Sequence, residues 1–136
     1  MARHPEQQLQ EWYALFLKSF PVLFCASAGG MRTNIRTAVK MKRAGYIKGH
    51  PDIVIYEPRS GWLGMCVELK VQTRPTPEQV QWQKNLNAKG YYSIIVPHEL
   101  SFQQAQDFLE TTTRQYLKGE ICRKGYTNIV NIQPAQ

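Results

Sequence analysis

Two acids and a lysine lie within or beside two apolar segments, and they are the side chains best suited to chemistry. Asp52 precedes residues 53–56, and Glu68 and Lys70 fall within residues 65–71. Both segments are β-prone, so they predict a hairpin whose two ends lie close together. Side chains alternate between the faces of a strand, which places Glu68 and Lys70 on one face. Asp52, at the start of the partner strand, can then approach Glu68 from across the hairpin.

The expected meeting of Asp52 and Glu68 has a chemical consequence. Two converging carboxylates repel each other unless a metal ion neutralises them. Their hard oxygen ligands suit Mg²⁺ or Mn²⁺. The pattern therefore predicts a divalent metal site, with Lys70 placed to orient or help deprotonate a water molecule and to stabilise developing charge. The structural alternative is an exposed ion pair between Glu68 and Lys70, worth about 0–1 kcal/mol.

The same residues form two half-motifs, Pro51-Asp52 and Glu68-Leu69-Lys70. They resemble the signature of the PD-(D/E)xK nuclease superfamily. Within it, the order of motifs over about residues 6–108 is similar to that of the virus-type replication-repair nuclease (VRR-NUC) domain. The further motifs are Glu6 before Leu9-Gln10, the pair Gly29-Gly30, Gly49 before Pro51-Asp52, and Gln79 three residues after Thr76. Ala28 and His50 depart from the family pattern, which usually has Asn and a small apolar residue there.

The resemblance implies a restriction-endonuclease-like core and a set of site residues. The implied catalytic residues are Asp52, Glu68, Lys70 and Gln79, and the implied metal ligands are Asp52, Glu68, the backbone carbonyl of Leu69, and Glu6. Two of these residues have structural alternatives. Glu6 lies in the first turn of a predicted helix, where it would complement the helix dipole. Gln79 occupies the third position of a capping box that begins at Thr76. Both roles stay open for each residue.

The net charge of +7 is concentrated in one part of the chain, because no acid occurs between Trp12 and Pro51. This stretch adjoins the expected metal site, and we therefore interpret it as a surface that binds DNA phosphates. The alternative is a solvated face that aids solubility. Helical spacing places most of the basic residues on one face of a predicted helix over residues 33–44. The predicted DNA-binding residues are Arg32, Arg36, Lys40, Arg43 and Lys48.

Periodicity and capping residues predict the order helix, strand, helix, hairpin, helix, strand, helix. We expect helices over residues 5–18 and 33–44, from Thr76 to Gly90 and from Ser101 to Gly119, with strands over 20–25, 53–56, 65–71 and 92–96 and a turn over 61–64. The strand 20–25 should be buried. The helix 33–44 should bury the face that carries Ile35, Ala38 and Val39. This order predicts an α/β fold with a mixed central sheet of about four main strands, flanked by helices, with the hairpin in the centre.

The 136 residues fit a single domain over residues 1–123, followed by a tail over 124–136. No apolar run approaches the ~18 residues of a membrane span, and the N-terminal residues lack the apolar centre of a secretory signal. We therefore expect a cytoplasmic protein, and relatives of this stand-alone size resemble phage, bacterial or mobile-element enzymes. Cys25, Cys66 and Cys122 are expected to be buried thiols. A zinc site built from them and His98 is disfavoured because there is no CxxC spacing.

The motifs together predict a metal-dependent, structure-specific DNA endonuclease. The sequence does not choose among DNA structures, whereas the resemblance implies homodimers that cut branched DNA such as Holliday junctions or flaps. The apolar pair Trp62-Leu63 and the strand-like residues 129–132 are the candidate dimer surfaces. The main alternative is a non-catalytic nucleic-acid-binding module that retains the nuclease fold. A small-molecule enzyme is disfavoured because there is no dinucleotide-binding GxGxxG and no Walker motif.

Overall fold

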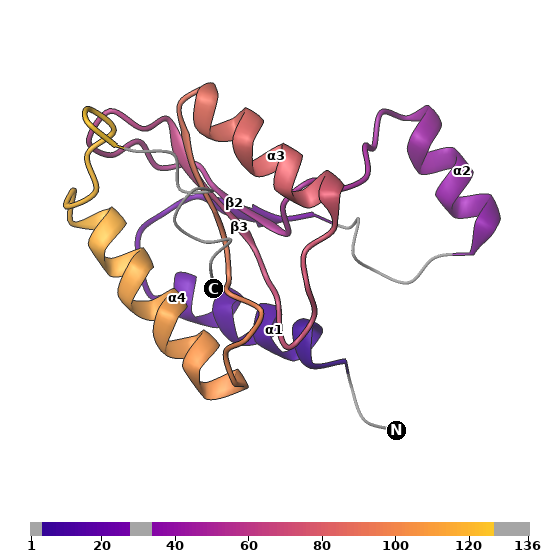
Figure 1. Ribbon diagram of the computed structural model, residues 1–136, viewed down its shortest axis with the longest axis horizontal. Helices are drawn as coiled ribbons and strands as arrows, with labels where there is room; N and C mark the ends of the chain where they lie inside the picture. Colours follow the sequence, from indigo (N-terminus) through magenta and orange to yellow (C-terminus); the bar gives the residue numbers. More distant parts are fainter. Residues whose placement is uncertain (1–3, 28–33, 127–136) are drawn as a thin grey trace.

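The computed structural model describes residues 4–27 and 34–126. The elements in these residues follow the predicted order (Figure 1). They are α1 (Pro5–Leu17), β1 (Phe24–Ala26), α2 (Ile35–Arg43), β2 (Ile53–Ile55), β3 (Gly64–Glu68), α3 (Pro77–Ala88), β4 (Tyr91–Ile95) and α4 (Phe102–Leu117). Several predicted features lie outside the described residues, namely the pair Gly29-Gly30, Arg32 and the strand-like residues 129–132.

The described strands form one mixed sheet in the order β1-β2-β3-β4. β2 pairs antiparallel with both β1 and β3, whereas β3 pairs parallel with β4. In Figure 1, α1 and α4 lie below the sheet and α3 lies above it. The α/β prediction is therefore confirmed, with the β2–β3 hairpin in the centre of a four-stranded mixed sheet.

Helix periodicity explains the core beneath the sheet. α1 buries Leu9, Tyr13 and Leu17, which are four residues apart and share one face. α4 packs beside α1, and the buried Tyr13 hydroxyl and Thr113 Oγ1 share a hydrogen bond of 2.7 Å. β3 is buried along its whole length because it lies between two strands and between two layers of helices. Glu68, at the C-terminal end of this strand, is therefore held in a fixed position away from solvent.

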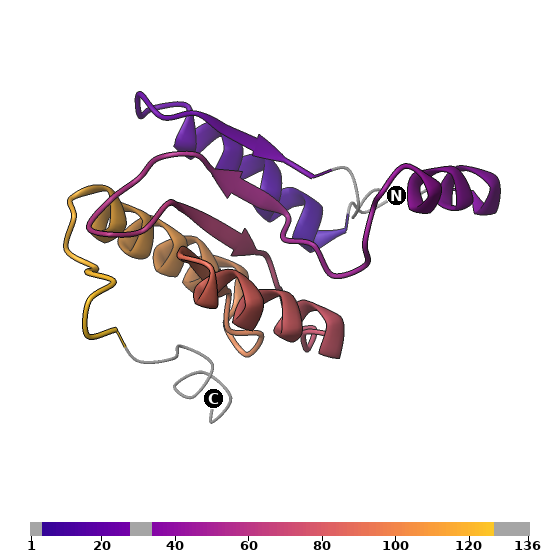
Figure 2. The same ribbon diagram turned by 90° about the horizontal axis from the view of Figure 1, so that it is seen from above.

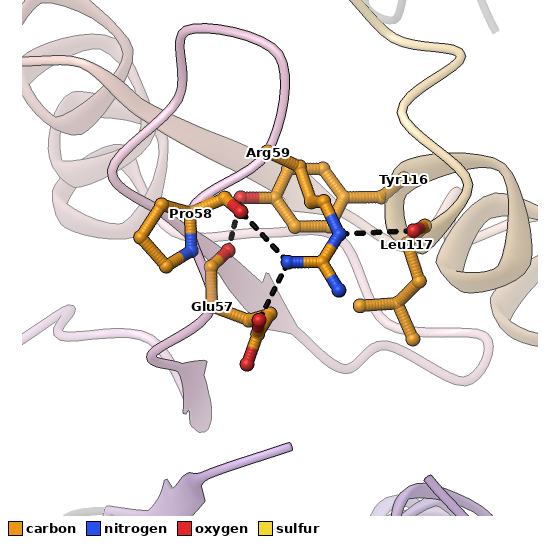
Figure 3. A network of polar contacts seen from close by, with 5 residues as sticks. All are labelled: Glu57, Pro58, Arg59, Tyr116 and Leu117. Carbon is orange, nitrogen blue, oxygen red and sulfur yellow. Dashed lines mark hydrogen bonds and ion pairs between the residues drawn. The ribbon is translucent and has the colours of Figure 1, made fainter. Parts of the chain in front are cut away.

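The hairpin loop is fixed against α4. Ser60 and Gly61 have φ values of 49° and 90° and form a tight turn, and the backbones of Arg59 and Trp62 hydrogen-bond across it. Arg59 pairs with Glu57 and donates to the backbone carbonyls of Pro58 and Leu117, at 2.8 and 3.0 Å (Figure 3). The Tyr116 hydroxyl donates to the Glu57 carbonyl at 2.7 Å. The loop is thus tied to α4 by several hydrogen bonds.

The turn lies at Ser60 and Gly61 rather than over residues 61–64 as predicted. This change alters the role expected for the apolar pair Trp62-Leu63. Trp62 is only 3% exposed, and its indole N–H donates to the Ile121 carbonyl at 2.9 Å. Leu63 alone remains exposed, at 55%. The pair Trp62-Leu63 is therefore not a free apolar surface. Sequence spacing did not reveal that the residues after α4 fold back over this indole.

The prediction of a buried strand over residues 20–25 was wrong about burial. β1 comprises only Phe24–Ala26, and Cys25 and Ala26 are exposed, as is Leu23 before them. β1 is an edge strand with β2 as its one neighbour in the described sheet. The apolar run therefore indicated β-structure but not burial. Of the three cysteines, only Cys66 is a buried thiol, since Cys25 and Cys122 are exposed.

α2 departs most clearly from its prediction. It buries no residue, and Ile35 and Val39 on the face expected to be buried are 85% and 44% exposed. Figures 1 and 2 both show α2 standing away from the sheet and from the other helices. The periodicity correctly predicted a helix with an apolar face. In the described residues, no other element packs against that apolar face. None of the helices in the described residues is long and apolar enough to cross a membrane.

Candidate active site

The hairpin register brings the two acids together. Ile53 pairs with Val67 in an antiparallel register, so Asp52, one residue before Ile53, lies opposite Glu68, one residue after Val67. Asp52 Oδ2 accepts a hydrogen bond of 2.8 Å from the backbone N–H of Leu69. The Asp52 and Glu68 carboxyl groups are within hydrogen-bonding reach when Glu68 is protonated. The expected approach of the acids across the hairpin is therefore present in the structure.

Burial and mutual repulsion control the protonation of this pair. Burial, followed by the negative charge of Asp52, raises the pKa of Glu68 far above its usual range. Burial also raises the pKa of Asp52, although the hydrogen bond from the Leu69 N–H opposes this shift. A lone buried pair of this kind holds a proton between its two carboxyl groups. A bound cation could take the place of that proton.

The hydrogen bonding of the two Glu68 oxygens indicates whether the site suits a metal ion. Oε2 accepts a hydrogen bond of 2.9 Å from Gln79 Nε2, whereas Oε1 is buried and accepts none from any described residue. Once the shared proton is lost, a buried carboxylate oxygen without a donor is costly, and beside a second carboxylate it suits a hard cation. Asp52 and Glu68 therefore fit Mg²⁺ or Mn²⁺ by charge and by donor type.

Lys70 lies close to both acids but in a different setting from the one expected. β3 ends at Glu68, so Lys70 follows the strand rather than extending it. Glu68 and Lys70 are only 6% and 5% exposed, so an exposed ion pair between them is wrong. The positive charge of Lys70 opposes the upward shifts in the pKa values of Asp52 and Glu68 without overcoming them. The ammonium group makes no hydrogen bond or ion pair with any side chain that the structure describes, which leaves it available to a ligand.

Gln79 closes the predicted capping box and also contacts Glu68, while its catalytic role stays a prediction. Its backbone N–H donates to Thr76 Oγ1 at 3.2 Å, and its side-chain Oε1 accepts from the Thr76 backbone N–H at 2.9 Å. The side-chain Nε2 is then free to donate to Glu68. The capping box thus orients the amide group, because the cap takes up its oxygen and leaves its nitrogen pointing at the acid.

Glu6 reaches the edge of the site from α1. Its Oε2 accepts a hydrogen bond of 3.3 Å from the Val71 backbone N–H, and its charge contributes to the raised pKa of Glu68. Among the described residues, no cluster of three or more His, Cys, Asp or Glu side chains is close enough to hold a metal ion. Metal ligation by Glu6 therefore stays a prediction, as does ligation by the Leu69 carbonyl.

The predicted DNA-binding residues within the described chain lie on or just after α2. Arg36, Lys40 and Arg43 lie on the helix and Lys48 lies in the segment that follows it, and all four are exposed. Arg32 lies outside the described residues. The basic residues therefore lie on an arm that leads directly into the segment carrying Asp52.

Three residues around the acids, Tyr46, His50 and Trp82, were not among the predicted site residues. The charges of Glu68 and Asp52 contribute, after partial burial, to a raised pKa of Tyr46, so this phenol lies near the acids. A protonated His50 ring would oppose the upward shift in the pKa of Asp52. The His50 ring meets the Trp82 ring edge-on, with 5.1 Å between their centroids. These positions depend on how residues 44–52 fold back, for which the sequence gives no signal beyond Gly45 and Gly49.

Comparisons with known proteins bear on the fold. A solved structure described as a "VRR_NUC domain protein" matches with a TM-score of 0.68 and 21% identity, over 88% of this chain and 93% of that one. A second, described as "VRR_NUC domain", matches with a TM-score of 0.51 and 20% identity, over 79% of this chain and 97% of that one. No protein-family model and no curated protein matches the sequence. The chain therefore has the fold of VRR-NUC domains, as its motifs predicted.

Proposed function

We propose that this chain, with its VRR-NUC fold, is a metal-dependent DNA endonuclease that hydrolyses phosphodiester bonds. One observation carries the proposal: Asp52 and Glu68 meet in a buried site where Glu68 Oε1 accepts no hydrogen bond from any described residue. A structural role does not explain two buried acids with raised pKa values, because apolar residues would be more stable there.

Asp52 and Glu68 would hold Mg²⁺ or Mn²⁺, and we propose the Leu69 carbonyl and Glu6 as additional ligands. Bound metal supplies a Lewis acid for the scissile phosphate and lowers the pKa of a water nucleophile. The fixed position of the acids comes from the chain itself. The Leu69 N–H holds Asp52 Oδ2, and Gln79 Nε2 holds Glu68 Oε2, which leaves Glu68 Oε1 for the metal.

Lys70 and Gln79 complete the proposed catalytic set. The Lys70 ammonium is buried beside the acids, where its charge would interact strongly with a bound phosphate because little water screens it. It would stabilise negative charge that develops on the phosphate and would orient the attacking water through Nζ. Gln79 acts on Glu68 rather than on the substrate, since its amide oxygen is held in the helix cap.

The basic residues of α2 and Lys48 would bind DNA phosphates next to this site. Phosphate contacts carry no sequence information, so we propose recognition of DNA structure rather than of sequence. Branched DNA, such as a Holliday junction or a flap, is the proposed substrate, and a homodimer would place two sites for paired cuts. With DNA as substrate, the proposed place of action is the cytoplasm of a bacterium or a phage-infected cell.

Cleavage of a panel of labelled DNAs tests this function. Plain duplex, nicked duplex, flap and four-way junction would be incubated with the protein and Mg²⁺, Mn²⁺ or EDTA. We expect cleavage with either metal and none with EDTA, and the fastest cleavage on a branched substrate. Binding to every DNA without cleavage under any condition would favour the non-catalytic binding module instead.

A further inference from the structure

Asp52 lies at the end of a segment that the sheet does not hold. Strand pairing on both sides of β2 begins at Ile53, and the Asp52 backbone carbonyl accepts one further hydrogen bond of 2.7 Å from the Ser27 N–H. The chain before Asp52 leads back to α2, which buries no residue. Neither the sheet nor α2 therefore fixes residues 48–51, which lead into Asp52.

α3 makes three contacts with that segment. Gly49 has a φ of 97° and packs so closely on α3 that a Cβ there would lie 2.8 Å from the backbone carbon of Glu78. The indole N–H of Trp82 donates to the Lys48 carbonyl at 3.1 Å. The same indole meets the His50 ring edge-on. Gln79, on the turn between Glu78 and Trp82, holds Glu68. One helix thus contacts both acid-bearing ends of the hairpin.

We propose that α3 is a clamp that positions Asp52, with Trp82 and Gly49 as positioning residues. The clamp seats residues 48–51, so that Asp52 Oδ2 meets the Leu69 N–H opposite Glu68. It also fixes the connection between the basic helix α2 and the acids. Its effect on catalysis rests on the proposed function, whereas its effect on Asp52 does not.

The Leu69 backbone amide reports the position of Asp52 without any metal, DNA or catalysis. Its N–H is bonded to Asp52 Oδ2, so its hydrogen-exchange rate, followed by NMR in EDTA, should rise when Asp52 is displaced. In Trp82→Phe, which keeps a ring but loses the indole N–H, we expect exchange at Leu69 to be about three- to tenfold faster, as the loss of one hydrogen bond suggests.

Trp62→Phe is the matched control. The Trp62 indole also donates to a backbone carbonyl, that of Ile121 at 2.9 Å, but in the hairpin loop and not beside the acids. It should leave Leu69 exchange unchanged, even if it lowers the melting temperature as much as Trp82→Phe. Equal exchange rates at Leu69 in Trp82→Phe and in the wild type would overturn the clamp.

A second pair of variants tests the contact of Gly49. Gly49 and Gly45 have φ values of 97° and 105°, so alanine is strained at both, but a Cβ at Gly45 would have no atom within 4 Å. Gly49→Ala should speed Leu69 exchange more than Gly45→Ala does. The same effect from both variants would show that backbone strain, and not packing on α3, governs the segment, and would contradict the clamp.

Measurements of metal binding and cleavage then distinguish a displaced Asp52 from a general loss of structure. In Trp82→Phe, the Mn²⁺ affinity measured by calorimetry and kcat should both fall several-fold, because Asp52 is displaced. KM for DNA should change less than kcat, because the side chains of Arg36, Lys40 and Arg43 are intact and only the segment around Lys48 is released. Trp62→Phe should change neither. If the wild type neither binds Mn²⁺ nor cuts DNA, the proposed function fails, while the exchange rate of Leu69 still decides whether the clamp exists.

Discussion

Glu68 is the residue on which the interactions of the site converge. It is opposed by Asp52, held by Gln79 and influenced by the charges of Lys70 and Glu6. The motif positions predicted that Asp52, Glu68 and Lys70 would lie together, and the hairpin register accounts for the two acids, because register follows local rules. Lys70 lies beside them just after the end of β3, and not through strand alternation as expected. The contributions of Tyr46, His50 and Trp82 could not be predicted, because they depend on the path of an irregular segment.

Metal-free Glu68→Gln should lose much of the pH dependence of stability. The folded-state pKa of Glu68 is raised above its ordinary 4.5, by burial and then by Asp52. The folded protein therefore binds this proton more tightly than the unfolded chain, and the free energy of unfolding falls as pH rises above 4.5. Glutamine cannot ionise. We expect the wild type to lose about 1 kcal/mol or more relative to the variant between about pH 5 and 8. Urea unfolding in EDTA measures this, and parallel pH profiles would contradict it.

Lys70→Ala should lower kcat by about 100-fold or more while changing Mn²⁺ affinity little, because the proposed role of its ammonium concerns the water and the transition-state charge. Single-turnover cleavage and calorimetry measure the two quantities. Lys89→Ala, at the exposed C-terminal cap of α3, is the control. Equal and modest effects of the two substitutions would remove Lys70 from the mechanism.

At the scale of elements, capping and periodicity predicted most helices and strands correctly. The box from Thr76 to Gln79 and the Ser101 cap begin α3 and α4 as expected. The errors concern burial rather than element type. The apolar face of α2 and the run before β1 were expected to be covered, but covering requires a partner surface, which a local pattern does not specify.

The exposed helix α2 should govern DNA affinity. Reversing Arg36 and Lys40 to Glu should weaken binding to every DNA structure similarly, and should make the salt dependence less steep by about two in logarithmic slope. Fluorescence anisotropy over a series of salt concentrations measures both. Lys89→Glu with Lys118→Glu makes the same change in net charge at the ends of α3 and α4. A slope that changes equally in both double variants would place the DNA elsewhere.

At the scale of the whole molecule, one subunit offers one proposed metal site, and paired cuts in a junction need two. We therefore predict a homodimer at micromolar concentration. The hairpin tip contributes less than expected, because Trp62 is buried and only Leu63 is exposed. The exposed Ile35 and Val39 on α2 are additional apolar surface. Light scattering gives the mass directly. A monomer mass, with and without DNA, would contradict paired cutting by a preformed dimer and would favour a flap- or nick-directed enzyme.

Removal of a single acid shows whether Asp52 and Glu68 hold a catalytic metal ion. Asp52→Ala and Glu68→Ala each remove a proposed metal ligand but no phosphate-binding cation. Cleavage of the best substrate in Mn²⁺ should fall below detection in both variants, whereas anisotropy should show DNA affinity close to that of the wild type. A folded variant without Glu68 that cuts DNA at the wild-type rate would contradict the assignment of the metal site.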